Sequence, residues 1–484
     1  MPYYITTPIY YVNDKPHIGH AYTTIVADVI ARWQRLKNEE VFFLTGTDEH
    51  GEKIEKAAFA AGTTPAVFVD SIVGKYTELW KILDISNDDF IRTTEERHIA
   101  VVKSFVKQLI KGGDIYKGEY EGWYCTPDET FFTKLQLVDG KCPECGRPVK
   151  RLKEESYFFR LSKYQGALLR FYENNAGFLA PEFRAREITN RVRNGLNDIS
   201  ITRKNVGWGI PFPGDESHTI YVWVDALLNY ISALGWPDGI FARFWPANVH
   251  MVGKEINWFH SVIWPAMLFS AGIEPPKKVF AHGWWTVEGK KMSKSVGNAI
   301  DPKVIAERYG RDSLRYFMIR EMPLGDDGDF SEKALAARIN GELVDDLGNL
   351  VYRALTLAER FGGSISGTAE LEKSLDLEGI MKCIEGLDLS GALEKVWSFI
   401  RASNRYINEK EAWKLSGEDF GNALYNLVEA LRVISILIKP FMPGTSESIR
   451  KQLGIQAEGL DACRFKEFKG RIVKGPYLFE KVKA

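Results

Sequence analysis

The sequence predicts an α/β fold: a split, Rossmann-like parallel sheet interrupted by an inserted connective module and followed by a C-terminal α-helical bundle. Three observations support it. A strand–helix–strand pattern opens the chain, the same alternation returns after a middle region rich in Cys, Pro and Gly, and the last third has only helical periodicity. A chain of 484 residues is also long enough for about three domains.

The first strand is expected within residues 3–11, which are dense in Tyr, Ile and Thr and are followed by a turn-rich stretch at 13–16. A helix should begin near Gly19, because apolar residues from Ile25 to Leu36 recur at the spacing of one helix face. Residues 41–44 form the next short apolar strand. Ligands of a parallel sheet bind beyond the carboxyl ends of its strands, so residues 10–20 and 45–50 should border a site.

Helical rhythm is lost between about residues 112 and 215, which we interpret as the insertion. Strands are then expected at 219–224, 249–252 and 278–281, with helices at 225–234 and 256–271. Beyond about residue 332, leucines and isoleucines recur every three or four residues, as in a helix bundle. The predicted units are 1–114 and 217–290 for the two halves of the sheet domain, 115–216 for the insertion, 291–335 for a linking region and 336–484 for the bundle.

Composition predicts a globular protein in a reducing compartment, and we expect it in the cytoplasm without a membrane span. The chain has 63 Lys+Arg against 64 Asp+Glu, so any nucleic acid must be bound by local patches and not by a global field. Five Cys are too few for a disulfide framework. The most apolar late stretch, residues 427–442, is interrupted by Glu429, Arg432 and Lys439.

The first chemical motif is Pro16-His17-Ile18-Gly19-His20, between the first strand and the first helix. Backbone N–H groups and the dipole at a helix N-terminus favour phosphate, and Gly19 removes a side chain from the ligand's path. The motif therefore predicts a nucleotide phosphate site. A pair of surface or metal-binding histidines is the alternative.

The second motif is Lys290-Lys291-Met292-Ser293-Lys294-Ser295, bracketed by glycines after the last expected strand of the sheet. Lysines on such a loop can close over a triphosphate and neutralise charge on departing pyrophosphate. Taken alone, the segment is more often a solvated basic turn.

The PHIGH and KMSKS strings, in this order around a split parallel sheet, resemble the two signatures of class I aminoacyl-tRNA synthetases. Residues 7–24, 42–54, 154–164, 221–235, 252–268 and 282–295 further resemble the methionyl-tRNA synthetase family, and the likeness runs from Tyr3 to about Trp413. The resemblance implies that L-methionine reacts with ATP, bound with Mg²⁺, to give methionyl-adenylate and pyrophosphate. The methionyl group is then transferred to tRNA(Met).

A methionine side chain needs an apolar, aromatic-lined pocket with one or two polar donors, because it is uncharged and polarisable. The resemblance implies a pocket that includes Tyr11 and Tyr230, with His260 and Tyr230 oriented toward the sulfur and Asp48 paired with the ammonium group. The other implied pocket residues are Ile9, Trp223, Ala226, Leu227, Ile256 and Trp264. Ordinary core packing is the alternative for each Trp, and a helix N-cap is the alternative for Asp48.

On the nucleotide side, the resemblance implies contacts with ribose and adenine from Gly253, Glu255, His282, Gly283 and Trp285. Glu255 departs from the family, which often has Asp there. The substrate carboxylate attacks the α-phosphate directly, so no protein nucleophile is needed. His17, His20, Lys291 and Lys294 are therefore assigned to stabilising transition-state charge, and no general base is named.

The insertion contains Cys125, Asp128, Cys142 and Cys145, two pairs with the spacing of a zinc knuckle. Relatives often have Cys at the position of Asp128. A Cys₃Asp zinc site is the preferred interpretation, and a three-thiolate site with water or a metal-free relic are the alternatives. A zinc here would be structural.

The resemblance also implies an anticodon-binding surface in the bundle, formed by Asn349, Arg353 and Trp413, because an exposed Trp can stack on an unpaired base while Asn and Arg read its edges. Ala412 stands where relatives commonly have Pro. The sequence given ends without the appended tRNA-binding module of some relatives, so we expect a monomer. Alternatives are another class I synthetase, a non-catalytic RNA-binding paralogue, and a small-molecule nucleotidyltransferase.

Overall fold

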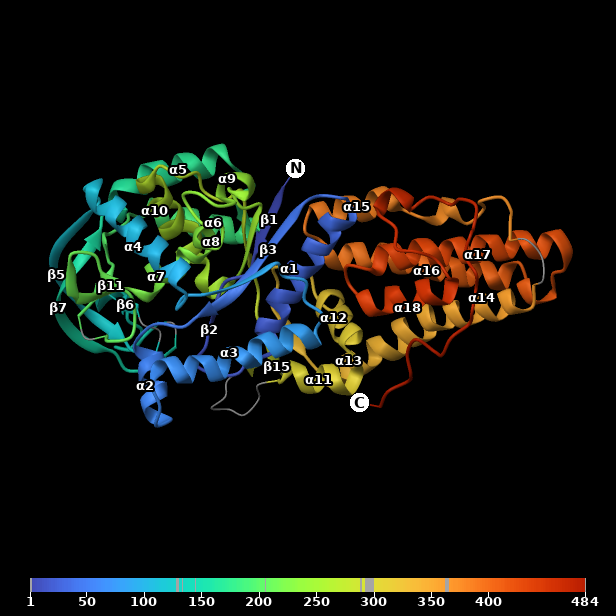
Figure 1. Cartoon of the computed structure of the whole chain (residues 1–484), viewed down its shortest axis with the longest axis horizontal. Coiled ribbons are helices and arrows are strands. Elements are labelled where there is room, and N and C mark those ends of the chain that lie inside the picture. The colour runs from blue at the N-terminus through green and yellow to red at the C-terminus, as the bar shows by residue number, and fades with distance from the viewer. Residues whose placement is uncertain are drawn as a thin grey trace.

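The structure, a computed structural model, describes residues 2–483 except 128–129, 133, 144, 205, 288–289, 292–299 and 362–364. The molecule is elongated: the α/β part lies at one end, the helical part at the other, and α1 and α12 lie between them (Figure 1). This arrangement agrees with the predicted combination of a parallel sheet and a helical C-terminal region.

A parallel sheet forms the centre of the α/β part. Its strand order is β2-β3-β1-β13-β14-β8, and β4 also pairs with β3. Ile5 of β1 is in register with Phe43 of β3 on one side and with Val249 of β13 on the other. The two halves of the sheet, which are separated in sequence, therefore meet at β1. The strands are β1 (Tyr3–Thr6), β2 (Tyr10–Tyr11), β3 (Val41–Asp48), β4 (Asp89–Arg92), β8 (Leu179–Ala180), β13 (Val249–Gly253) and β14 (Val279–His282).

Helices cover both faces of this sheet, because successive residues of a strand point to opposite sides. Ile5 packs in the core that includes α1 (Ile18–Leu36) and α3 (Pro65–Ile82). Tyr4 packs in a second core with α4 (Glu96–Lys111) and α10 (Trp264–Ala271). The first core continues into the helical part, so one face of the sheet is joined to the bundle by apolar packing.

Three segments differ from the sequence prediction. Residues 219–224 do not form a strand of the parallel sheet: β12 (Asp215–Ile220) pairs antiparallel with β10 (Thr202–Arg203) and β11 (Pro211–Phe212), and α7 (Val222–Leu227) begins directly after it. The helix expected at 256–271 begins as η3 (Lys254–Ile256) and a π-helical turn, η4 (Phe259–Ile263), since Pro265 lacks the N–H of a regular helix. Strand β8, from the insertion, extends the central sheet.

The insertion has a sheet of its own with the order β6-β5-β7-β9. Strand β5 pairs with β7 along ten successive residues from Ile115↔Phe159 to Tyr124↔Lys150, so this hairpin is the backbone of the module. Its elements are β5 (Ile115–Cys125), β6 (Thr130–Phe132), η1 (Lys134–Gln136), β7 (Lys150–Phe159), η2 (Leu161–Tyr164), α5 (Gln165–Asn174), α6 (Glu182–Arg193) and β9 (Ile199–Ser200).

The helical part is built around α17 (Gly417–Ile438). This helix is long and apolar enough to span a membrane by length and composition, but 94% of its most apolar window is buried inside the protein. It is therefore the core helix of the bundle. The elements that contact it include α14 (Asn349–Glu359), α16 (Leu389–Glu409), η8 (Ala412–Lys414), α18 (Pro443–Leu453) and η9 (Leu460–Ala462). The helix α15 (Leu377–Glu385) packs on α16, and η7 (Glu372–Ser374) precedes α15 in the chain.

Short elements complete the chain and connect the two parts. They are α2 (Glu52–Ala60), α8 (Asn229–Ser232), α9 (Phe241–Phe244), β15 (Trp285–Val287), β16 (Lys290–Lys291), α11 (Pro302–Tyr309), α12 (Arg311–Arg320), β17 (Gly328–Phe330), α13 (Glu332–Arg338) and the π-helical η6 (Ile339–Gly348).

The two parts are joined by a buried arginine on α12. Arg315 donates to Asp28 Oδ2 on α1 at 2.7 Å, and both side chains are fully buried. It also donates to the carbonyl oxygens of Pro440 and Phe441, between α17 and α18. Burial alone raises the pKa of Asp28, but Arg315 and Arg32 lower it more. The ion pair therefore stays charged and anchors the bundle to the first helix of the sheet domain.

Candidate active site

A cavity of about 420 Å³ opens at the carboxyl edge of the central sheet. Asp48 ends β3, Gly253 ends β13 and His282 ends β14, and all three line this cavity. The N-terminus of α1 closes it with His17, Gly19 and His20. The site thus lies where a parallel sheet is expected to bind its ligands.

The cavity brings together most of the residues singled out from the sequence. On the amino-acid side it is lined by Ile9, Tyr11, Asp48, Trp223, Ala226, Leu227, Tyr230, Ile256 and His260, and on the nucleotide side by His17, Gly19, His20, Gly253, Glu255, His282, Gly283 and Trp285. Trp264 is the exception. It is fully buried beneath the pocket, where its Nε1 donates to His250 Nε2 at 3.3 Å.

The two imidazoles at the start of α1 form a reciprocal cap. Gly19 N donates to His17 Nδ1 at 3.1 Å, and His17 N donates to His20 Nδ1 at 3.2 Å. The rings stack with centroids 3.7 Å apart. Because each Nδ1 accepts a backbone hydrogen bond, the proton of each neutral ring is on Nε2. The pair therefore carries its N–H donors on the ring edge away from the helix backbone.

This cap leaves little room for a side chain at Gly19. A Cβ at that position would lie 3.0 Å from His17 Cε1 and 3.1 Å from its Nδ1. The glycine of the PHIGH string therefore makes room for the folded-back imidazole as well as for a ligand.

The apolar end of the cavity is closed by a neutral polar pair. Tyr230 Oη lies 2.6 Å from His260 Nε2, and His260 Nδ1 lies 3.0 Å from the Ile256 carbonyl oxygen. The carbonyl accepts only, so Nδ1 carries the proton and Tyr230 donates to Nε2. Burial lowers the pKa of His260 to about 4, so the ring is uncharged near neutral pH. A pocket with these properties suits an uncharged thioether better than an ionic side chain.

Asp48 lies at the end of β3 and is buried. It is not a helix cap, because α2 begins at Glu52 and its N-cap is Gly51. Asp48 is one of the residues that line the cavity.

The nucleotide side is ordered by a second neutral histidine. His282 Nδ1 donates to the Gly283 carbonyl oxygen at 2.7 Å, and its Nε2 accepts from Thr23 Oγ1 at 2.8 Å. Burial lowers the pKa of His282. At Gly283 a Cβ would lie 2.0 Å from the Asp326 carbonyl oxygen, so only glycine fits this turn.

Sequence reasoning missed several lining residues, among them Lys53, Asn229 and Trp284. Trp284 is the most informative, because its Nε1 donates to Glu255 Oε2 at 2.6 Å and so orients that carboxylate. Trp284 could have been predicted, because it lies directly between Gly283 and Trp285, which were both predicted to contact the nucleotide. Asn229 was also detectable, since it lies one helical turn after Ala226.

The lysine-rich loop is only partly described. The backbone of Lys291 belongs to β16 and pairs with Thr286 of β15, which starts two residues after Gly283. The Lys291 side chain and the whole of Lys294 lie outside the described residues.

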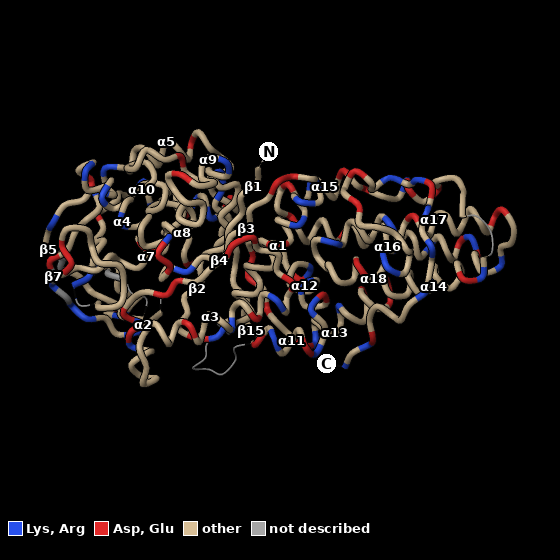
Figure 2. Tube along the Cα trace, viewed as in Figure 1, with Lys and Arg blue, Asp and Glu red and all other residues tan. Residues whose placement is uncertain are grey.

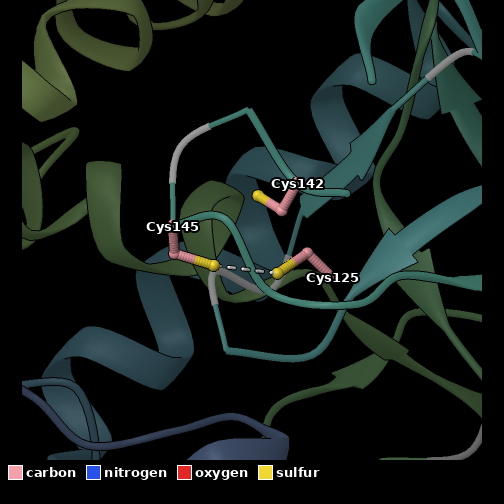
Figure 3. A group of neighbouring side chains, drawn as sticks. All are labelled: Cys125, Cys142 and Cys145. Carbon is pink, nitrogen blue, oxygen red and sulfur yellow. Dashed lines mark hydrogen bonds between the residues drawn. The ribbon is translucent and has the colours of Figure 1, made fainter. Parts of the chain in front are cut away.

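The insertion gathers three of its cysteines into a small cluster. The sulfur atoms of Cys125, Cys142 and Cys145 lie within 4.8 Å of one another, and those of Cys125 and Cys145 are 3.5 Å apart. Figure 3 shows the three sulfur atoms pointing toward a common centre. Asp128 lies outside the described residues.

The residues predicted to read an anticodon lie on the bundle surface. Asn349 is exposed, and Arg353, one turn later on α14, donates from Nη2 to Asn408 Oδ1 at 2.7 Å. Asn408 is in the last turn of α16, and Trp413 follows in η8 with 43% of its surface exposed. Lys and Arg are interspersed with Asp and Glu along both parts of the molecule (Figure 2).

The split parallel sheet, the two-imidazole helix start and the lysine loop define a class I aminoacyl-tRNA synthetase. The family described as tRNA synthetases class I (M) matches residues 3–153 and 147–355. A methionine–tRNA ligase of Caldanaerobacter subterraneus is 48% identical across 99% of this chain and 79% of its own length. One from Thermotoga maritima is 46% identical across 100% of this chain and 81% of its own length.

Solved structures give the same result. Methionyl-tRNA synthetase of Mycobacterium tuberculosis in complex with methionyl-adenylate superposes with a TM-score of 0.94 at 41% identity, covering 99% of each chain. The free-state structure of that enzyme superposes with a TM-score of 0.88 at 37% identity, covering 100% of this chain and 98% of its own. The chain belongs to the methionine–tRNA ligase family.

Proposed function

We propose that this chain activates L-methionine with ATP to methionyl-adenylate and pyrophosphate, and then transfers the methionyl group to tRNA(Met). The observation that carries the proposal is the single cavity that joins an apolar, aromatic pocket to the two-imidazole start of α1. Membership of the methionine–tRNA ligase family supports the same reaction.

For methionine, we assign the ammonium group to Asp48 and the side chain to the pocket between Ile9, Trp223 and Tyr230. Tyr11, Ala226, Leu227, Ile256 and His260 complete that pocket. The neutral Tyr230–His260 pair presents no net charge to the sulfur. Trp264 is assigned a supporting role, because it packs beneath Tyr230 with ring centroids 6.1 Å apart.

For ATP, which enters with Mg²⁺ as substrate, we assign the phosphates to His17 and His20. Their Nε2–H groups are preorganised donors, and such donors stabilise charge that develops in the transition state. Lys291 and Lys294 are assigned to the pyrophosphate on the resemblance of their string. Gly253, Glu255, His282, Gly283 and Trp285 are assigned to ribose and adenine, with Glu255 oriented by Trp284.

The methionine carboxylate attacks the α-phosphate in this scheme, and pyrophosphate leaves. The chain's side chains bind, orient and stabilise charge, and none of them forms a covalent intermediate. The main contribution is the alignment of two bound reactants within one cavity.

We propose a structural zinc bound by Cys125, Cys142 and Cys145, with Asp128 as the fourth ligand. Tetrahedral zinc with Zn–S bonds of about 2.3 Å places its sulfurs about 3.8 Å apart. The sulfur spacing within 4.8 Å is close to that requirement. When bound, the metal would order the tip of the insertion and take no part in the chemical steps.

For tRNA, we propose that Trp413 stacks on an unpaired anticodon base while Asn349 and Arg353 contact base edges. The exposure of Trp413 and the joining of Arg353 to Asn408 near it support this surface. We also propose a cytoplasmic, monomeric enzyme.

Aminoacylation of tRNA(Met) with labelled methionine tests the full reaction. We expect methionyl-tRNA from tRNA(Met) and none from an elongator tRNA specific for a different amino acid. Activation of methionine without charging of tRNA(Met) would refute the second step, and charging of both tRNAs would refute the assigned anticodon selectivity.

A further inference from the structure

A buried network of two histidines around one carboxylate lies behind the methionine pocket. Asp225 Oδ2 lies 2.7 Å from His50 Nδ1, and its Oδ1 lies 2.7 Å from His98 Nε2. His98 Nδ1 in turn lies 2.8 Å from Ser232 Oγ. The side chains of Asp225, His50 and His98 are 1%, 7% and 0% exposed.

The network is a charged centre in the protein interior. Burial by itself raises the pKa of Asp225, but the two imidazoles lower it to about 2, so the carboxylate stays ionised. A carboxylate accepts hydrogen bonds only, so each ring must present an N–H to it. A buried carboxylate without these donors would be strongly unfavourable. The relative position of the three side chains is therefore tightly fixed.

From outside the cavity, the three side chains connect segments of the chain that carry pocket residues. Asp225 lies on α7 between Trp223 and Ala226, which line the cavity. His50 is two residues beyond Asp48, and His98 comes from α4. None of the network residues is among those that line the cavity in the described part of the chain.

The helix α7 is only six residues long, from Val222 to Leu227, and its N-cap residue makes no side-chain hydrogen bond to it. Apolar packing also holds it, because Val222 and Leu227 are buried in the second core and the Trp223 ring stacks on Phe259 with centroids 3.9 Å apart. The segment after β3 is held by Trp208 through two hydrogen bonds. Trp208 Nε1 donates to the Glu49 carbonyl oxygen at 2.5 Å, and the Trp208 carbonyl oxygen accepts from Gly51 N. The histidine–carboxylate network is thus the polar link between this anchored segment and α7.

We propose that His50, Asp225 and His98 are positioning residues that set the distance between the ammonium-binding Asp48 and the apolar wall of the methionine pocket. They thereby determine methionine affinity without contacting the substrate. The inference rests on the proposed methionine pocket. Displacing a binding wall by about 1 Å is enough to change rates by about 100-fold.

Asp225→Asn tests the network while keeping the packing. The amide oxygen still accepts from one imidazole, but the amide NH2 group faces the N–H that the other ring presents to the carboxylate, so one of the two links is lost. His50→Ala and His50→Asn form a second test, because an asparagine amide N–H can take the place of the Nδ1–H group.

The measurement is methionine-dependent ATP–pyrophosphate exchange with both substrates varied, together with the thermal midpoint. We expect Asp225→Asn and His50→Ala to raise KM for methionine about tenfold or more while KM for ATP stays within about twofold. His50→Asn should recover most of the wild-type KM for methionine.

Glu429→Gln is the matched control. Glu429 is a buried carboxylate of α17 whose Oε2 lies 2.8 Å from Arg432 Nη2, far along the chain from the pocket residues. It should lower the thermal midpoint and leave KM for methionine unchanged. If Asp225→Asn and His50→Ala change both KM values equally, or neither, the positioning role is wrong. If the wild-type chain shows no methionine-dependent exchange, the proposed function is wrong instead.

Discussion

Gly19→Ala should separate catalysis from stability at the start of α1. The new Cβ would lie 3.0 Å from His17 Cε1 and 3.1 Å from its Nδ1, which is tighter than an ordinary contact. The His17 ring must therefore shift by a few tenths of an ångström, which lengthens its hydrogen bond from Gly19 N. The same shift disturbs its stacking on His20.

Two effects of this substitution on the free energy of unfolding oppose each other. Weakening a helix cap costs up to about 1 kcal/mol, and replacing glycine by alanine inside a helix contributes about 1 kcal/mol in favour of folding. The free energy of unfolding should therefore change by less than about 1 kcal/mol. The rate of adenylate formation should fall about tenfold, because a preorganised donor to the phosphates is displaced by a few tenths of an ångström.

Pyrophosphate exchange at saturating methionine and urea unfolding together measure the two effects. Gly74→Ala is the matched control, because Gly74 lies inside α3 and nothing would contact its Cβ within 4 Å. That variant should be slightly more stable and fully active. Retention of activity within about threefold in Gly19→Ala would show that His17 does not act as a donor in the reaction.

Three further predictions concern the pocket, the bundle and the insertion. His260 has a folded-state pKa of about 4, below the ordinary 6.5, so unfolding takes up a proton between those pH values. The free energy of unfolding should therefore fall by up to about 3 kcal/mol from pH 6.5 to pH 4. His260→Gln should show a shallower fall in unfolding experiments, and an equal slope would refute the assignment. Trp413→Ala should leave pyrophosphate exchange intact and lower kcat/KM for tRNA charging about 10-fold to 100-fold, since stacking on one base is worth about 1–3 kcal/mol. An equal loss of exchange and of charging would contradict the anticodon role. Cys142→Ser should abolish the zinc that elemental analysis finds in the wild type and lower the thermal midpoint, whereas a wild type that binds no zinc after refolding with the metal would contradict the site.

The sequence predicts the sheet well where periodicity and position coincide. Strands β1, β3, β13 and β14 fall where apolar runs were expected, and the three residues that end β3, β13 and β14 all reach the cavity. It fails at residues 219–224, where a β-rich composition is divided between an antiparallel hairpin and the first turn of α7. Local propensity carries no information about which sheet a short strand joins, because long-range pairing decides that.

The candidate site, too, is predictable from the sequence only in part. Histidines at a helix start and a carboxylate at a strand end are visible from spacing alone. Trp284 donates to Glu255, and His50 and His98 surround the charge of Asp225. These contacts join residues far apart in sequence, so spacing along the chain does not reveal them. Trp264, for which the resemblance implies a place in the pocket, is fully buried and is not among the residues that line the cavity.

The most direct measurement is ATP–pyrophosphate exchange by the purified chain with each of the twenty amino acids and no tRNA. The uncharged, aromatic-lined pocket and the family predict exchange with methionine alone. Exchange with a different amino acid would contradict the pocket assignment, and no exchange with any amino acid would contradict the catalytic role of this cavity.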